Sequence, residues 1–239
     1  FAHRGASAHA PENTLAAFKL AVEHGADAIE LDAKLSADGE VVVIHDQTVD
    51  RTTNGHGTVR KLKLEELKKL DAGLHFGARF SGERIPTLAE VFESIGKDLF
   101  INVEFTNYAS PGDELVVRVV ELVRKYQLEE RVLFSSFFAG NLIRAGNLLP
   151  EVPRGMLAEE GWSGWLARSV LRRRVAPHAI HPYFTDVTRD LVRKHHHWQR
   201  KIFVWTVNEE REMRRLFELG VDGVFTDDPR LARQVLGVV

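Results

Sequence analysis

Short apolar runs and amphipathic segments alternate along this chain with a fairly steady period. The apolar runs have strand character, and the first two end at His3 and Asp32. The others lie at 100–105, 132–136, 154–157, 179–181, 203–207 and 223–226. Segments with apolar residues at helical spacing separate them, for example 15–24, 114–126 and 209–219. Eight strand and helix units in this length predict a (β/α)8 TIM barrel.

A doubly wound open sheet is the competing architecture. It would usually carry a glycine-rich phosphate turn after its first strand, whereas Gly5 stands alone there. The chain has 239 residues, which suits one large α/β domain, so we expect a single catalytic barrel over 1–239. From 47 to 96 the pattern changes to glycine-punctuated loop and short helices. We interpret this segment as a small insertion after the second strand.

Function in such a barrel lies at the carboxyl ends of the strands. That rule selects His3, Arg4, Glu30, Asp32, Glu104, Ser135, Ser136, His181, Trp205, Asn208 and Asp227. Glu104 matters most, because it interrupts an apolar run in which an unpaired buried charge would be costly. His181 and Trp205 are pocket candidates by position, although such residues usually belong to the core.

The stretch around Glu30 and Asp32 predicts a site. Residues two apart in a strand share a face, so these two carboxylates point the same way. Asp38 and Gly39 read as a two-residue hairpin turn, which would place His45 directly opposite Asp32. Asp46 is then available to orient the His45 ring. The alternative is an ordinary surface hairpin with exposed charges.

The chemistry of these side chains points to a phosphodiester. Glu30, Asp32 and Glu104 offer hard oxygen ligands that suit Mg²⁺ or Ca²⁺, with Mn²⁺ as a further candidate. His3 and His45 can flank the ion as proton donor and acceptor. Arg4 supplies a planar cationic fork suited to phosphate. The alternative for any one carboxylate is an ion pair with Lys or Arg inside the barrel mouth.

The composition limits the classes of molecule that this protein is expected to bind. Lys and Arg total 32 against 34 Asp and Glu, a net charge of −2, which gives no basic surplus for nucleic acid or anionic membrane. A small-molecule substrate is therefore the default. The absence of cysteine excludes disulfides and thiolate ligands. No apolar run reaches membrane-spanning length, so we expect no stable membrane insertion and, on weaker grounds, a cytoplasmic location.

Several motifs together closely resemble the glycerophosphodiester phosphodiesterase family over nearly the whole chain. The early motifs are His3-Arg4-Gly5, Pro11-Glu12-Asn13-Thr14, Glu30-Leu31-Asp32, His45-Asp46, Arg51-Thr52-Thr53 and Ile85-Pro86-Thr87-Leu88. The late motifs are 204–208 (VWTVN) and 222–229 (DGVFTDDP). The resemblance implies a metal-dependent hydrolase that releases sn-glycerol 3-phosphate and an alcohol from deacylated phospholipids.

The resemblance also implies roles for individual residues. His3 and His45 match the acid/base pair, Glu30, Asp32 and Glu104 match the metal ligands, and Arg4 matches a phosphate contact; we add Trp205 as a substrate-binding candidate. The chain departs from the pattern at Thr106, where many members have lysine two residues after the third acid. The phosphate therefore loses one positive contact, or another group replaces it.

Two rival functions and two distracting motifs remain. The chain could act on intact lysophospholipids, with the tryptophans of 162–166 and the arginines of 168–174 as a membrane contact, or it could be a non-catalytic phosphodiester-binding barrel. Segments with the composition of 162–174 more often pack their tryptophans inward and expose their arginines to solvent. The run 195–197 (HHH) cannot close on one ion, because successive helical residues point about 100° apart. We interpret it as the polar end of a helix.

Overall fold

The computed structural model describes residues 1–161 and 175–237 and forms a closed barrel of parallel strands. The strand order is β1 (Ala2–His3), β2 (Ala28–Leu35), β4 (Phe100–Phe105), β5 (Val132–Ser136), β6 (Arg154–Ala158), β7 (Ala179–Pro182), β8 (Lys201–Val204) and β9 (Gly223–Val224). A parallel bridge between Ala2 and Thr226 joins the first strand to the end of the last. The backbone N–H of His3 donates to Thr226 O at 2.9 Å, and that of Thr226 donates to Phe1 O at 3.0 Å. The predicted (β/α)8 barrel is confirmed.

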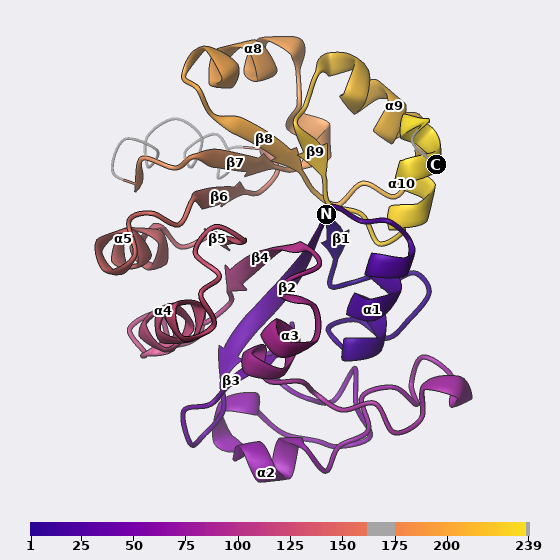
Figure 1. The fold of residues 1–239 in the computed structure, drawn as a ribbon, viewed down its shortest axis with the longest axis vertical. Helices are drawn as coiled ribbons and strands as arrows, with labels where there is room; N and C mark the ends of the chain where they lie inside the picture. The colour runs from indigo at the N-terminus through magenta and orange to yellow at the C-terminus, as the bar shows by residue number, and fades with distance from the viewer. Residues whose placement is uncertain (162–174, 238–239) are drawn as a thin grey trace.

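Amphipathic helices surround the barrel (Figure 1). They are α1 (Leu15–Glu23), α3 (Leu88–Ile95), α4 (Leu115–Tyr126), α5 (Ala139–Leu148), α8 (Arg189–His197), α9 (Glu210–Leu219) and α10 (Pro229–Leu236). Thr14 caps α1 by accepting from the Ala17 N–H, and Thr87 forms a capping box with Glu90 at the start of α3. Each cap fixes where a helix leaves a loop at the mouth of the barrel.

The hairpin after β2 differs from its predicted register. Its return strand, β3 (Val41–Val43), pairs Ala33 with Val43, and the Ile44 N–H donates to Asp32 O at 2.9 Å. The turn has three residues, because Ser36 N–H donates to Glu40 O and Gly39 takes a left-handed φ of 84°. Ile44 therefore lies opposite Asp32, and the prediction that His45 does so was wrong by one residue.

The segment after β3 forms a small layer beside the barrel. It contains η1 (Val59–Lys61), α2 (Leu64–Leu67) and η2 (Ala78–Phe80), and Figure 1 shows it at the lower edge of the molecule. An apolar cluster of its own holds it together: Val42, Ile44, Val49, Val59, Leu67, Ala72 and Ile85. The helix α3 packs instead into the main core with the barrel strands. The boundaries of an insertion over 47–96 stay a prediction.

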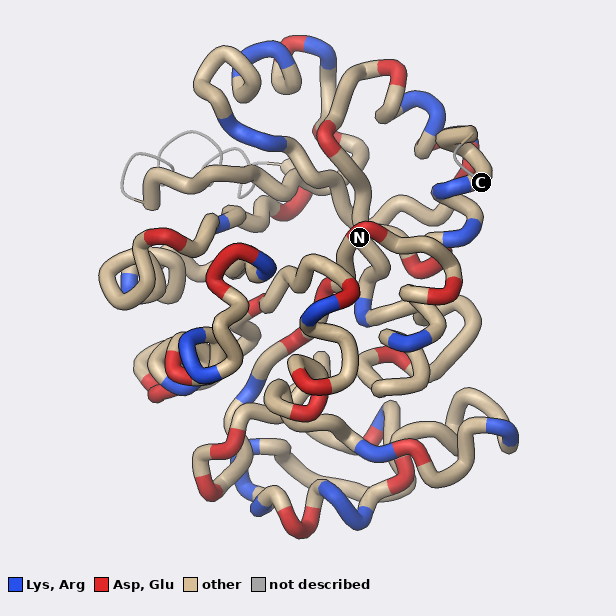
Figure 2. The backbone as a smooth tube through the Cα atoms, in the orientation of Figure 1, with Lys and Arg blue, Asp and Glu red and all other residues tan. Residues whose placement is uncertain are grey.

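The surface carries both signs of charge. Lys and Arg alternate with Asp and Glu over the helices and loops, as Figure 2 shows. Within residues 1–161 and 175–237, no helix is both long enough and apolar enough to cross a membrane. The segment 162–174, with its tryptophans and arginines, lies outside the described residues.

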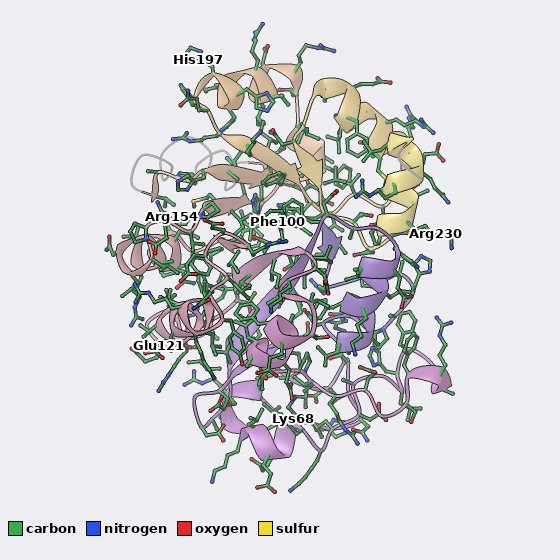
Figure 3. The ribbon with its side chains drawn as sticks, viewed as in Figure 1. Lys68, Phe100, Glu121, Arg154, His197 and Arg230 are labelled. Atoms are coloured by element: carbon green, nitrogen blue, oxygen red, sulfur yellow. The ribbon has the colours of Figure 1, made fainter. Side chains whose placement is uncertain are left out.

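The histidine run at 195–197 forms the end of α8, as predicted. His195 is buried, His196 Nε2 lies 2.8 Å from an oxygen of Asp222, and His197 is exposed at the periphery of the molecule (Figure 3). The three side chains therefore have three different environments. One short 3₁₀ segment, η4 (Phe184–Asp186), precedes this helix.

Candidate active site

Three carboxylates meet at the carboxyl end of the barrel. Parallel pairing places Asp32 of β2 beside Glu104 of β4, and Glu30 beside Asn102. One oxygen from each of Glu30, Asp32 and Glu104 lies within 4.8 Å of the other two. Glu30 is 3% exposed and Asp32 is 1% exposed. The acids that the sequence placed on one face are thus gathered in a nearly dry pocket.

Burial and mutual repulsion change the proton affinity of this cluster. Burial, followed by the charge of Asp32, raises the pKa of Glu104 to about 8. Burial and the charges of Asp32 and Glu104 raise the pKa of Glu30 well above its ordinary value. Three clustered carboxylates repel one another, and bound protons or a bound cation would relieve this repulsion.

Arg4 and Asn13 hold the carboxylates in place. The Arg4 backbone N–H donates to Glu30 Oε2 at 3.0 Å, and its Nε lies 3.3 Å from Asp32 Oδ2. Asn13 Nδ2 donates to the same Asp32 oxygen at 2.8 Å. Both Arg4 and Asn13 adopt left-handed backbone conformations, with φ of 56° and 57°. This strain is typical of functional loops.

The predicted histidines both line the pocket that contains the acids. His3 Nδ1 lies 2.7 Å from Asp227 Oδ1, and that carboxylate also accepts from Ser7 and Asn208. Burial opposes ionisation of Asp227, but the contact with His3 and the hydrogen bonds from Asn208 and Ser7 together outweigh it and lower the pKa of Asp227. The ring of His3 is therefore oriented from the far end of the sequence.

His45 is oriented through a chain of ion pairs. Its Nδ1 lies 2.7 Å from Asp46 Oδ1, as the sequence suggested. Arg51 donates from Nε to Asp46 at 2.7 Å and from Nη1 to Glu12 at 2.7 Å. The hydrogen bonds from Arg51 and His45 hold the pKa of Asp46 well below its ordinary value. Glu12 in turn accepts from Arg4 at 2.9 Å. This chain of contacts connects His45 to the carboxylate site.

Aromatic side chains form the rest of the pocket wall. Trp205 lines it, donating from Nε1 to His181 O at 2.7 Å and packing edge-on against Phe137. Tyr108 donates its hydroxyl proton to Glu104 Oε1 at 2.8 Å. The lined space is a small cavity of about 90 Å³.

His181 belongs to the core and does not reach the pocket. It is fully buried, and burial lowers its pKa to about 3, so the ring is neutral. It fills the space beside Gly155, where a β-carbon would collide with the imidazole ring. Its position near the end of a strand therefore does not place His181 in the pocket, and its side chain belongs to the core.

Lys34 is a buried cation that the sequence interpretation passed over. It follows Glu30 and Asp32 on the same face of β2 and is 4% exposed. Its Nζ donates to Thr106 Oγ1 at 2.7 Å and to Thr106 O at 2.9 Å. Burial lowers the pKa of Lys34, while the charges of Asp32 and Glu104 act in the opposite direction.

Two other features lie apart from the pocket. A larger cavity of about 560 Å³ opens among the amino ends of the strands, near Ala28, Ile101 and Ala179, at the opposite end of the barrel from the carboxylates. A second group of possible ligands, His9, His24 and Asp228, already contains an ion pair of 3.0 Å between His9 and Asp228. The chemistry described above belongs to the carboxylate pocket.

Some residues of the pocket gave no clear signal in the sequence. Tyr108 lies in a loop with no periodic pattern, and its contact with Glu104 appears only when the loop folds back. Asn13 and Thr14 both look in the sequence like caps of the first helix, and Thr14 performs that role. Arg51 and Glu12 stood in the motifs, but their ion pair joins segments 39 residues apart. Spacing alone cannot predict such contacts.

The donor set fits a hard divalent cation. All three groups are carboxylates, and Glu30 Oε1 is buried with no hydrogen-bond partner among residues 1–161 and 175–237. An unpaired buried carboxylate oxygen is costly, and a cation bound by the cluster would remove that cost. The pocket thus contains acidic groups that could bind a metal.

Comparison with known proteins agrees with this geometry. The model of the glycerophosphoryl diester phosphodiesterase family matches residues 3–231. A glycerophosphodiester phosphodiesterase from Caldanaerobacter subterraneus subsp. tengcongensis is 46% identical over 95% of this chain and 93% of its own. A human lysophospholipase D is 30% identical over 98% of this chain and 84% of its own.

A solved structure of a phosphodiesterase is also similar to this chain. An Oleispira antarctica phosphodiesterase in complex with the product sn-glycerol-3-phosphate superimposes with a TM-score of 0.91 at 33% identity. The similarity covers 99% of this chain and 95% of that one. With the family model matching nearly every residue, the chain belongs to the glycerophosphoryl diester phosphodiesterase family.

Proposed function

We propose that this protein hydrolyses glycerophosphodiesters to sn-glycerol 3-phosphate and an alcohol. The observation that carries the proposal is the convergence of three carboxylates, Arg4 and two oriented histidines on one cavity of about 90 Å³. The named activity of the Caldanaerobacter relative and the product bound to the Oleispira phosphodiesterase support it. A glycerophosphodiester presents one phosphate anion and a small polyol, which matches this space and charge.

His3 and His45 are the proposed proton carriers. Each ring directs Nδ1 to an aspartate at 2.7 Å, so the neutral ring keeps its proton on Nδ1 and offers the Nε2 lone pair. A ring protonated at both nitrogens can instead donate from Nε2. One ring accepts the proton of the attacking hydroxyl, and the other protonates the departing alkoxide as the bond from phosphorus to oxygen breaks.

Glu30, Asp32 and Glu104 would hold a divalent cation, with Mg²⁺, Ca²⁺ and Mn²⁺ as the candidates. When bound, such an ion neutralises the carboxylates and withdraws charge from a phosphoryl oxygen. Arg4 keeps Asp32 and Glu30 oriented, and its guanidinium adds positive charge on the substrate side. Trp205 forms an apolar wall that excludes water from one side of the substrate.

The decisive assay measures sn-glycerol 3-phosphate released from glycerophosphocholine. Protein stripped with excess chelator is compared with samples to which Mg²⁺, Ca²⁺ or Mn²⁺ has been restored. We expect no release in chelator and recovery with at least one ion. A folded protein inactive with every ion would contradict the proposal and favour a non-catalytic binding role. A glycerol cyclic phosphate trapped during turnover would identify a neighbouring glycerol hydroxyl as the nucleophile, whereas direct attack by water forms no such intermediate.

A second candidate substrate is an intact lysophospholipid. The observation in its favour is the similarity to a human lysophospholipase D over nearly the whole chain. Lysophosphatidylcholine, offered below and above its micellar concentration, tests this candidate in the same assay. Choline release from the lysolipid that exceeds release from glycerophosphocholine would make the lysolipid the preferred substrate.

A further inference from the structure

Two arginines near the carboxylate pocket are paired with acidic side chains. The Arg4 side chain contacts Glu12 at 2.9 Å and Asp32 at 3.3 Å. Arg51 contacts both Glu12 and Asp46 through short ion pairs. A phosphate that enters the pocket therefore meets two arginines that already neutralise carboxylates.

Lys34 differs from them, because its hydrogen bonds go to Thr106 and not to a carboxylate. An ammonium group has three N–H donors, and two of them go to Thr106, to its hydroxyl at 2.7 Å and its carbonyl at 2.9 Å. One donor is left for a ligand. With the residue only 4% exposed, solvent has little access to this group, and a buried cation favours an anionic partner.

The position of Lys34 along β2 sets where that donor can act. Side chains at 30, 32 and 34 share one face of the strand, and each step of two residues advances about 6–7 Å toward the carboxyl end. Lys34 therefore lies one layer nearer the barrel mouth than Asp32. A phosphate that rests on the carboxylate site from the mouth side occupies this layer.

Thr106 holds the ammonium in position. Pairing of Asp32 with Glu104 and of Ala33 with Phe105 brings Thr106 alongside Lys34 on the neighbouring strand. Thr106 is 2% exposed and donates its own hydroxyl proton to Ala33 O at 2.9 Å, so its oxygen remains an acceptor for Lys34. Its short side chain leaves room for a lysine reaching across from β2.

We propose that Lys34 is a substrate-binding residue that donates its third N–H to a phosphate oxygen of the diester and of the phosphomonoester product. The inference rests on the proposed function, whose site it completes. It also accounts for the departure at Thr106, because the positive charge is supplied from the neighbouring strand.

The test compares four proteins by calorimetric titration with sn-glycerol 3-phosphate in the presence of Mg²⁺ and by steady-state hydrolysis of glycerophosphocholine. Lys34→Met removes the ammonium at nearly constant length. Lys34→Gln/Thr106→Lys moves it to the adjacent strand. Lys97→Met is the matched control, since Lys97 is exposed and lies ahead of β4 at the other end of the barrel. The native protein is the reference.

Lys34→Met should weaken product binding by about ten- to a hundredfold, which is the usual range for a lost charge-assisted hydrogen bond. KM should rise more than kcat falls, because the contact exists in ground and transition states alike. The swapped variant should recover most of the product affinity, and Lys97→Met should match the native protein. If Lys34→Met fails to fold, the double variant Lys34→Gln/Thr106→Lys becomes the test. Weak product binding by that variant contradicts the proposal.

A role in neutralising the acids gives a different result. Removing Lys34 would then tighten Mn²⁺ binding and leave product affinity unchanged, and this outcome overturns the proposal. If the native protein hydrolyses the diester and Lys34→Met keeps native affinity for the product, the proposed function stands and the proposal for Lys34 is wrong. If the native protein binds the product through Lys34 but hydrolyses no diester, the proposal for Lys34 stands and the proposed function is wrong.

Discussion

His45 shows how a single side chain depends on partners outside its own strand. It follows β3, is 42% exposed at its side chain, and is steadied by Asp46, which Arg51 holds in turn. A histidine this open to water depends on the contact between its Nδ1 and Asp46, at 2.7 Å, to fix the orientation of its ring. The neighbouring Asp46 was visible in the sequence, but the support from Arg51 was not.

Replacing His45 by Ala should reduce turnover of glycerophosphocholine by about a hundred- to ten-thousandfold, because one of the two proposed proton carriers is lost. Mn²⁺ affinity should stay close to native, since the carboxylates are untouched. The matched control is His56→Ala. His56 also contacts an aspartate, at 3.2 Å, but its side chain is 87% exposed and away from the pocket. Near-native turnover in His45→Ala would remove it from the mechanism.

Glu104 makes the stability of the metal-free protein depend on pH. Its pKa of about 8 in the folded state lies above the ordinary value of 4.5, so the folded protein keeps a proton that the unfolded chain releases between these values. The free energy of unfolding should therefore fall as pH rises through this window. Urea unfolding in chelator at about pH 5 and about pH 8 measures the fall. Glu104→Gln should show a smaller fall in the free energy of unfolding over this pH range. An equal fall in both proteins would argue against the raised pKa of Glu104.

The candidate site was predicted well where it depends on strand periodicity. Glu30, Asp32 and Glu104 follow from the alternation of side chains in β2 and β4, which any parallel pairing preserves. The interpretation missed Tyr108 and Lys34. Tyr108 reaches the pocket from a loop, and Lys34 crosses to a partner strand 72 residues away. Contacts of that kind depend on packing between segments, which periodicity does not encode.

At the scale of elements, the hairpin between β2 and β3 shows the limit of turn prediction. Asp38-Gly39 suggests a two-residue turn, yet Ser36 pairs with Glu40 and three residues remain in the loop. Asp38 also accepts from Ser36 and from the Leu64 N–H, a contact with another helix that favours this form. His45 still reaches the pocket, because it lies beyond the strand and its loop turns inward.

Gly39→Ala should lower the free energy of unfolding by about 1 kcal/mol. The glycine has φ of 84°, and the space that an alanine methyl group would occupy is open, so the cost is that of the backbone conformation alone. Gly77→Ala is the matched control, since Gly77 has an extended φ of 164° and equally open space. Urea denaturation of both variants gives the comparison. Equal stabilities would show that the turn relaxes to another form.

At the scale of the whole molecule, the barrel was predictable because eight strands repeat with intervening helices. The closure between β1 and β9 could not be read from either segment, since each contributes only two residues of regular strand. The aromatic contacts of Phe1 with Phe203 and Phe225, at 4.8 and 4.7 Å between ring centroids, pack that junction. Such contacts join the two ends of the described chain.

Metal binding should stabilise the whole fold. An ion present at about a hundred times its dissociation constant adds about 2.7 kcal/mol to the free energy of unfolding, which for a chain of this size raises Tm by roughly 5–10 °C. Scanning calorimetry with chelator and then with Mg²⁺, Ca²⁺ or Mn²⁺ measures the shift. Glu30→Gln should lose most of it. An equal shift in that variant would place the ion elsewhere.

The junction between β1 and β9 also has a consequence for biosynthesis. His3 is translated 224 residues before the aspartate that orients it, and the backbone partner of the first strand comes at Thr226. A growing chain therefore carries Glu30, Asp32 and Glu104 before it can orient His3. Chains that a stalled ribosome releases before Asp227 is added would lack this partner, so we expect them to be inactive toward glycerophosphodiesters.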